Sequence, residues 1–331
     1  MSGPGVSLAF VAILGAAASG LAGQTEAARL TYESEHMGTT FRIVAYTHDR
    51  AQADGAARAA FAHIARLDSL FSDYRPDSEI AGLADHAGSG SFVPVTPELL
   101  SVLQDAQHWA RRTEGAFDVT VGPLSRLWRW SSRRGELPND ERVAAARSVV
   151  GFRRLALNAT ELEARLTERG MSLDLGGIAK GYAADAALAI MAEHGIGASL
   201  VDAGGDLALG DPPPDERGWL VALPNGNSLR LAHVGVATSG DAHRHVTIDG
   251  VRYAHIVDPR TGLGVVDAPT VTVVAPDATT ADALASALTV MDRASGMKLT
   301  RSVDGAWATV TGSASWMTGQ QPERASQQNR R

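Results

Sequence analysis

Residues 239–262 gather several chemically active side chains in one short stretch, SGDAHRHVTIDGVRYAHIVDPRTG. The pair Asp249-Gly250 lies between two alternating runs, which is the pattern of a β-hairpin with a tight two-residue turn. The returning strand and the loop after it carry a titratable base, a carboxylate, a cation and a hydroxyl: His255, Asp258, Arg260 and Thr261. These groups on one hairpin suit a transfer reaction on an anionic substrate.

A second stretch supplies oxygen ligands. Asp282 and Ser286 stand four residues apart in a helical pattern, so both lie on one helix face. A carboxylate and a hydroxyl side by side suit Mg²⁺, which takes oxygen ligands. An ordinary helix acid and a small packing residue would look the same, and the pair alone is a weak signal. Together with the hairpin, it predicts phosphoryl chemistry on a substrate that already carries phosphates.

The stretch LDLGGIAKGYAAD, residues 173–185, adds a candidate anion site. A predicted strand ends in Asp174, two glycines follow, and a helix begins with Lys180 near its first turn. Glycines there let backbone N–H groups approach a ligand, and a helix N-terminus favours anions. The glycine spacing fits neither a P-loop nor the GxGxxG motif, and an ordinary strand-to-helix turn can have a similar sequence. Lys180 favours the phosphate interpretation, whereas DAGGD at 202–206 is interpreted as structural.

Two histidines raise the question of a zinc site. His243 and His245 alternate on a strand close to Asp241. No further ligand is fixed by spacing, so a transition-metal site is not predicted. His255 differs because the DPRTG loop follows it directly, which favours a catalytic base over a histidine that is merely hydrogen-bonded.

Composition excludes several classes of protein. The chain has 331 residues and is 44% apolar, which is enough for one large domain or two lobes with a real core. Its net charge is −7 and it has no extended basic run, which argues against nucleic-acid binding. There is no cysteine, so disulfides, thiol catalysis and cysteine-ligated zinc are excluded.

The N-terminus indicates export. Residues 6–18, VSLAFVAILGAAA, form an apolar run followed by small residues, which predicts a signal peptide over residues 1–23. The run is too short for a membrane-spanning helix, so no transmembrane segment is expected in the mature chain. LAGQ at 21–24 has Gln24 where a lipoprotein cleavage box has its cysteine. We therefore expect an exported, periplasmic protein without that lipid anchor.

Periodicity and turn signals divide the rest of the chain. Helices are expected over 49–71, from Pro97 with Thr96 as N-cap to near Gly115, over 178–194 and over 278–291. Strands are expected at 40–46, near 152–157, 162–166 and 171–174, through most of 198–275, and at 306–312. Residues 131–142 are expected to be loop. This order favours an α+β fold with mixed or antiparallel sheets. Residues 24–312 would form the domain and 313–331 a disordered polar tail.

Eight blocks in order resemble those of the ApbE family, the FAD:protein FMN transferases. They are MGTTFRI, FSDYRPDSEI, GAFDVTVGPLSRLW, LDLGGIAKGYAAD, VDAGGDL, VATSGD, YAHIVDPRTG and TVVAPDATTADALASAL. The resemblance runs from about Met37 to Val290 and implies the ApbE-like fold. It also implies Mg²⁺-dependent transfer of the FMN half of FAD to a Ser or Thr hydroxyl of a flavin-accepting protein, with release of AMP. Such acceptors are redox-complex subunits or flavin carrier domains.

The resemblance also implies roles for single residues. Asp282, Ser286 (where the family usually has threonine) and a backbone carbonyl near Gly177 would bind the metal. His255 would be the base, with Asp258 and Thr261 beside it in the catalytic loop. Flavin, ribose or phosphate would be lined by Met37, Tyr74, Asp118, Asp174, Lys180, Ser239, Gly240, His255 and Arg260.

Two other classes of function stay open. An FAD pyrophosphatase would use water in place of the protein hydroxyl and release FMN and AMP. A non-catalytic periplasmic FAD-binding protein would leave FAD intact, and the presence of His255, Asp258 and Asp282 argues against it.

Overall fold

The structure is a computed structural model that describes residues 26–240, 245–312, 315–319 and 321–322. The predicted signal peptide, residues 1–23, lies outside the described residues, as does the end of the predicted tail, residues 323–331. Among the helices that the structure describes, none combines the length and the apolar character needed to cross a membrane.

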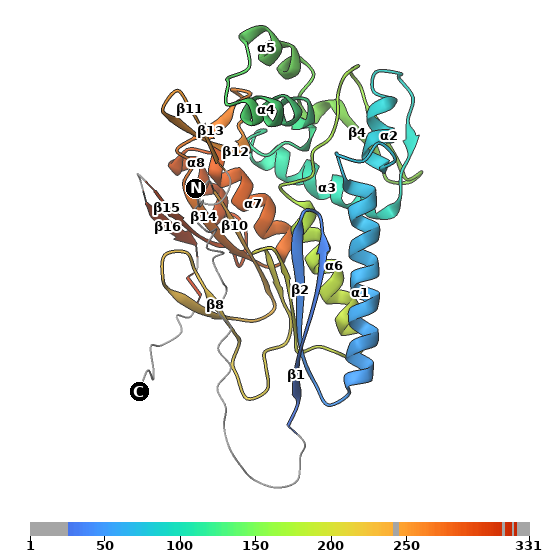
Figure 1. Cartoon of the computed structure of the whole chain (residues 1–331), viewed down its shortest axis with the longest axis vertical. Coiled ribbons are helices and arrows are strands. Elements are labelled where there is room, and N and C mark those ends of the chain that lie inside the picture. The colour runs from blue at the N-terminus through green and yellow to red at the C-terminus, as the bar shows by residue number, and fades with distance from the viewer. Residues whose placement is uncertain (1–25, 241–244, 313–314, 320, 323–331) are drawn as a thin grey trace, which may run out of the picture.

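One eight-stranded sheet organises the fold (Figure 1). The strand order is β1-β2-β6-β7-β10-β14-β15-β16, and every neighbouring pair is antiparallel. Its strands are β1 (Ala28–His36), β2 (Thr39–Thr47), β6 (Ser199–Ala203), β7 (Leu207–Leu209), β10 (Val234–Ser239), β14 (Thr270–Ala275), β15 (Trp307–Thr311) and β16 (Trp316–Gly319). An antiparallel sheet packed with helices confirms the predicted α+β class.

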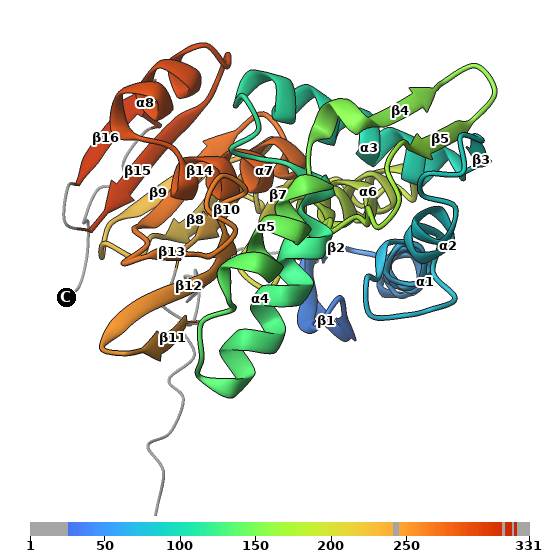
Figure 2. The same cartoon turned by 90° about the horizontal axis from the view of Figure 1, so that it is seen from above.

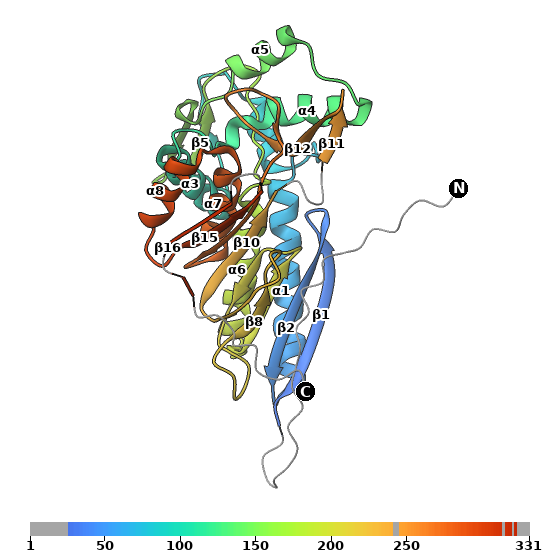
Figure 3. The same cartoon turned by 90° about the vertical axis from the view of Figure 1, so that its left-hand side faces the viewer.

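The two faces of the sheet are covered differently. Successive side chains of a strand point to opposite faces. Ile43 and Val273 accordingly join the core beneath the helices, whereas Val44 and Val274 pack with a small hairpin on the other face. The helix side carries α1 (Arg50–Phe71), α3 (Pro97–Arg112), α6 (Ala179–Glu193), α7 (Ala278–Val290) and α8 (Arg293–Arg301). The hairpin is β8 (Trp219–Ala222) and β9 (Ser228–Leu231), and Figure 3 shows both layers.

A second, smaller unit lies at one end of the molecule (Figures 1 and 2). It joins α4 (Gly122–Arg134) and α5 (Asp140–Ser148) to a three-stranded sheet of β11 (His245–Ile248), β12 (Val251–Val257) and β13 (Gly264–Val266). The predicted turn at Asp249-Gly250 connects β11 to β12, with φ angles of 50° and 79°. Positive φ at both positions is typical of a tight hairpin turn, so the prediction is confirmed.

The remaining elements cover the outer side of the helices. They are α2 (Glu79–Asp85), the one-turn helices Val119–Val121 and Phe152–Arg154, and the strands β3 (Val93–Pro94), β4 (Leu155–Asn158) and β5 (Glu163–Leu166). The predicted start of α3 is confirmed, because the Thr96 hydroxyl accepts a hydrogen bond from the Leu99 N–H at 3.3 Å.

Two local predictions are wrong. Residues 131–142 are loop only over 135–139, since 131–134 are the end of α4 and 140–142 are the beginning of α5. Both helices lie on the surface and bury only a narrow apolar stripe, so their sequences are mostly polar. Residues 171–174 form no strand and instead lead from β5 towards α6.

The predicted boundary of the tail at residue 313 is also too early. β16 pairs with β15 as the last strand of the large sheet. Trp316 is only 9% exposed and Thr318 is buried, whereas Met317 between them is exposed. A short edge strand needs apolar contact on one face only, so its composition resembles that of a polar tail.

The beginning of α7 is held tightly by its neighbours. Asp185 of α6 accepts hydrogen bonds from the N–H groups of Ala278 at 2.9 Å and Thr279 at 2.8 Å. Burial raises the pKa of Asp185 to about 6, against the effect of these hydrogen bonds. A Cβ on Gly181 would lie 2.2 Å from the Ala278 oxygen, and one on Gly235 would lie 2.2 Å from the Ala278 nitrogen. Both glycines are therefore required by close backbone packing.

We predict that Gly235→Ala destabilises the protein by about 1–3 kcal/mol or more, because the added methyl group would collide with α7 backbone that cannot move freely. Urea denaturation measures this change. Gly82→Ala is the matched control, since Gly82 lies in α2 with no atom within 4 Å of the added Cβ. It should be neutral or stabilising by about 0.5–1 kcal/mol. Equal effects of the two substitutions would contradict the packing role of Gly235.

Candidate active site

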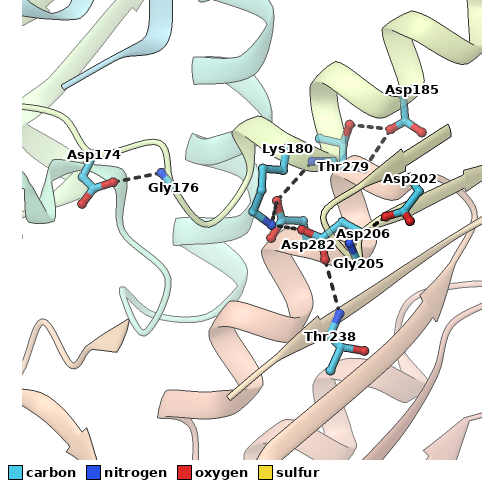
Figure 4. A network of polar contacts seen from close by, with 11 residues as sticks. Asp174, Gly176, Lys180, Asp185, Asp202, Gly205, Asp206, Thr238, Thr279 and Asp282 are labelled. Atoms are coloured by element: carbon cyan, nitrogen blue, oxygen red, sulfur yellow. Dashed lines mark hydrogen bonds and ion pairs between the residues drawn. The ribbon is translucent and has the colours of Figure 1, made fainter. Parts of the chain in front are cut away.

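A buried carboxylate lies near the start of α7. Asp282 is 2% exposed, and its Oδ2 accepts a hydrogen bond from the Gly181 N–H at 3.2 Å. The same oxygen lies 4.0 Å from the Lys180 Nζ (Figure 4). Burial raises the pKa of Asp282, and the positive charge of Lys180 opposes this shift. Burial therefore disfavours the ionised form of Asp282 unless positive charge nearby balances it.

Lys180 is shared between two buried carboxylates. It forms an ion pair with Asp206, which follows β6 and is also 2% exposed. The other oxygen of Asp206 accepts the N–H of Thr238 on β10 at 3.3 Å. One ammonium facing two carboxylates leaves one negative charge, and a divalent cation would balance it. The sequence prediction named Lys180 but missed Asp206, for which the only signal was a Gly-Gly pair at a strand end.

Ser286 and the Gly177 region complete the predicted oxygen donors. Residues 281–285 and 287–290 of α7 are buried, and Ser286 alone between them is partly exposed. A Cβ built on Gly177 would lie 2.8 Å from the Ser286 Oγ, so the loop before α6 packs directly on this hydroxyl. In the described part of the chain, the Ser286 Oγ has no hydrogen-bond partner.

These donors fit Mg²⁺. The carboxylate of Asp282, the hydroxyl of Ser286 and a backbone carbonyl near Gly177 are hard oxygen groups from one helix turn and the loop that faces it. The carboxylate is buried and short of positive charge, while the hydroxyl has a free acceptor oxygen. The structure thus brings the three predicted ligands together, and their role in metal binding stays a prediction.

The DPRTG loop, residues 258–262, lies at the other end of α7. The Asp258 carboxylate accepts bonds from the Arg260 backbone N–H at 2.8 Å and from its Nη2 at 2.8 Å. That Nη2 also donates to the carbonyl oxygen of Val290, the last residue of α7, at 2.8 Å. The Thr261 hydroxyl donates weakly to the Asp258 carbonyl at 3.4 Å. The bond to Asp258 raises the pKa of Arg260. Asp258 and Arg260 act here as a clamp between loop and helix, and their contact with substrate stays a prediction.

His255 lies on β12 just before this clamp. Its side chain is exposed, although Tyr253 and Val257 on either side are buried. The pairing of β12 with β13 shifts register between those two residues. Irregularities of this kind re-aim side chains and are frequent near active sites. An exposed histidine on a fixed hairpin is accessible to a second molecule.

Arg129 of α4 joins two predicted residues that are far apart in sequence. Its guanidinium lies 4.6 Å from the ring centre of Tyr74 and 3.8 Å from the Asp174 carboxylate, and it forms an ion pair with Asp73. Asp174 also accepts the Gly176 N–H at 2.9 Å. Tyr74 is 72% exposed, so its ring is free to contact a ligand. The sequence reasoning missed Arg129, because nothing local to it indicates these partners.

Asp118 has an internal role. It is 7% exposed and its carboxylate accepts the N–H and hydroxyl of Thr120 at 2.8 and 2.7 Å and the Phe152 N–H at 2.8 Å. Burial raises its pKa and the Thr120 bonds oppose this. Asp118 therefore fixes the loop before α4. Because its carboxylate already accepts these internal hydrogen bonds, its surroundings do not favour direct contact with a cofactor.

The last predicted residues lie at turns and strand ends. Met37 forms the β1–β2 turn with a φ of 50°, and its N–H donates to Asp68 at 3.1 Å. Ser239 ends β10, and a Cβ on Gly240 would lie 2.8 Å from the Pro269 oxygen. Residues 241–244, including His243, lie outside the described residues.

Known proteins are similar to this chain in both sequence and fold. The chain matches the model of the ApbE family over residues 37–310. It is 34% identical over 276 residues to the FAD:protein FMN transferase of Vibrio cholerae, covering 79% of this chain and 81% of that protein. It is 33% identical over 292 residues to the FAD:protein FMN transferase of Treponema pallidum, covering 81% and 80%.

Solved structures agree. The ApbE protein of Thermotoga maritima matches with a TM-score of 0.79 at 30% identity, covering 90% of this chain and 97% of that one. The flavinyl transferase ApbE of Pseudomonas stutzeri matches with a TM-score of 0.78 at 26% identity, covering 90% and 96%. The matched segment includes every site residue named above, from Met37 to Ser286. The chain therefore belongs to the ApbE family of flavin transferases.

Proposed function

We propose that this protein transfers the FMN half of FAD to a Ser or Thr hydroxyl of a flavin-accepting protein, with Mg²⁺, and releases AMP. The observation that carries the proposal is the donor set at α7: buried Asp282, the Ser286 hydroxyl, which has no hydrogen-bond partner among the described residues, and the adjoining Gly177 backbone. The family match supports the flavin substrate, and several relatives bear the name FAD:protein FMN transferase.

The metal would be held by Asp282, Ser286 and a carbonyl near Gly177. When bound, Mg²⁺ supplies positive charge to the pyrophosphate oxygens, which become more negative as AMP departs. Without it, the two carboxylates around Lys180 leave a net negative charge at this place, which would repel a pyrophosphate. We infer that the anionic substrate binds productively only together with the cation.

His255 is our candidate base. It would accept the proton of the acceptor hydroxyl while that oxygen forms a bond to the FMN phosphorus. The bond from this phosphorus to the AMP oxygen breaks, and AMP leaves with that oxygen. The clamp of Asp258, Arg260 and the Val290 carbonyl keeps the end of the hairpin in register with α7. The base and the metal ligands are thereby held on one rigid frame.

We also propose that the protein works in the periplasm. The apolar run at residues 6–18 and the small residues after it support an export signal. Cell fractionation with intact mass measurement is the test: we expect a periplasmic chain that has lost about the first 23 residues. A full-length chain in the cytosol would contradict export.

We predict that Asp282→Asn lowers FMN transfer at least about a hundredfold at saturating Mg²⁺, because the carboxylate ligand is lost. The fold should survive, since the buried carboxylate is disfavoured by burial and Lys180 keeps its partner Asp206. Transfer is measured as the gain of one FMN by a purified flavin carrier domain in intact mass spectrometry. Thermal unfolding monitors stability, and chelation of the wild type should reproduce the loss.

Asp267→Asn is the matched control, because Asp267 is exposed after β13 and its side chain has no partner in the described structure. Unchanged transfer by Asp282→Asn would refute the metal site. Wild-type protein that releases FMN and AMP without labelling the carrier would be a pyrophosphatase. Wild-type protein that leaves FAD intact would be a binding protein.

We predict that His255→Ala still binds FAD but transfers FMN about a hundredfold more slowly or worse, because the hydroxyl loses its base. Single-turnover transfer and FAD binding by fluorescence separate the two effects. His245→Ala on the adjacent strand β11 is the control for loss of an exposed imidazole from the same sheet. Loss of FAD binding in His255→Ala would show that His255 is a pocket wall and not a base.

A further inference from the structure

The Tyr74 ring is covered on one face and open on the other. Tyr74 lies between α1 and α2, and at 72% exposure it is the most exposed of the large apolar and aromatic side chains that the structure describes. The guanidinium of Arg129 on α4 covers one face of the ring, with its central carbon 4.6 Å from the ring centre. An aromatic ring with a free face can stack on another flat ring.

Arg129 is held in place from several sides. Its Nη2 forms an ion pair with Asp73, the residue before Tyr74, and lies 3.8 Å from the Asp174 carboxylate. Its Nε donates a hydrogen bond to the carbonyl oxygen of Ser125, one turn earlier in α4, at 3.2 Å. Because guanidinium N–H groups point outward in the plane of the group, these contacts leave its flat face to the aromatic ring.

The same arginine is connected to the oxygen donors at α7. The Oδ2 of Asp174 faces Arg129, while its Oδ1 accepts the Gly176 N–H at 2.9 Å (Figure 4). The next residue, Gly177, packs on Ser286, because a Cβ there would lie 2.8 Å from the Ser286 Oγ. A series of direct contacts therefore leads from the aromatic ring to the proposed metal ligands.

Stability of the fold does not explain this arrangement. A ring with most of its surface in water gains little from burial, so Tyr74 adds little to the core. An ion pair with Asp73 would also form with a lysine at position 129, whereas a flat contact with an aromatic ring requires the guanidinium. The structure thus holds an exposed ring in one orientation, which is how a binding site presents a side chain to its ligand.

We propose that Arg129 is a positioning residue for FAD, which presents the open face of Tyr74 to one of the two flat ring systems of that substrate; this rests on the proposed function. FAD has a flat ring system on each side of its pyrophosphate, so a pyrophosphate at the metal donors places both rings against neighbouring elements. A side chain that is already held loses less conformational freedom when the ligand binds. Arg129 acts through Tyr74 and contacts no reacting atom.

The test compares Arg129→Gln with Arg129→Lys, with FAD binding measured by fluorescence titration without the carrier. Glutamine removes the charge and the planar group, and we expect the dissociation constant and the KM for FAD to rise about tenfold. The rate of transfer at saturating FAD should stay within about twofold of wild type, because the metal ligands and His255 are unchanged. Lysine keeps the charge beside Asp73, so Arg129→Lys should regain wild-type thermal stability but at most a part of the affinity for FAD.

Arg133→Gln is the matched control, because Arg133 is exposed one turn later on α4 and its side chain has no ion pair or hydrogen bond with the described part of the chain. It should leave FAD binding unchanged. Tyr74→Leu should weaken FAD binding by itself, and adding Arg129→Gln to it should change the dissociation constant by less than about twofold. Such non-additive effects indicate an arginine that acts through the ring, and independent effects would overturn the proposal.

Inhibition of transfer by FMN and by AMP identifies the ring system that stacks on Tyr74. We expect Arg129→Gln to weaken inhibition by one of the two about tenfold and by the other less than about twofold. Equal weakening of both would overturn the proposal, because it would show a general disturbance of the site and not the loss of one stacking contact.

The outcomes separate this inference from the proposed function. A wild-type protein that labels the carrier, with unchanged FAD binding in Arg129→Gln, overturns the role of Arg129 alone. Full recovery of both stability and affinity in Arg129→Lys also overturns that role, in favour of a purely structural ion pair. A wild-type protein that releases FMN and AMP without labelling the carrier contradicts the transferase, and the expected loss of FAD affinity in Arg129→Gln would then still support the inference. A wild-type protein that binds no FAD overturns both.

Discussion

The architecture depends on burying two carboxylates beside one ammonium group. Asp206 and Asp282 are each 2% exposed, and Lys180 lies between them (Figure 4). Removing a carboxylate from water costs several kcal/mol unless opposite charge and hydrogen bonds replace its hydration. The N–H groups of Gly181 and Thr238 supply two of those bonds. Three elements, α6, β10 and α7, must therefore meet within hydrogen-bonding distance, and that requirement fixes the centre of the molecule.

Helix α7 transmits this constraint to the rest of the site. Its start is fixed by Asp185 and by close contact with Gly181 and Gly235. Ser286 then faces the Gly177 loop one turn after Asp282, and the last carbonyl of the helix receives Arg260. Each residue of an α-helix turns by about 100°. A slip of one residue would break all of these contacts together, so the register of α7 positions both the oxygen donors and the DPRTG loop.

What the sequence could predict was local. The Asp249-Gly250 turn, the cap at Thr96 and the shared face of Asp282 and Ser286 all follow from residues close together in the chain, and the structure has each of them. The Lys180–Asp206 ion pair is different, because nothing in the spacing of a lysine and a remote aspartate specifies their meeting.

Other contacts could not be predicted from the sequence for the same physical reason. Arg129 joins Tyr74 to Asp174 only because tertiary packing brings three separate segments together. The internal bonds of Asp118 likewise depend on Phe152, which lies 34 residues away. The end of α4 and the beginning of α5, within residues 131–142, were predicted as loop because the polar surface of these helices outweighs their narrow buried stripe.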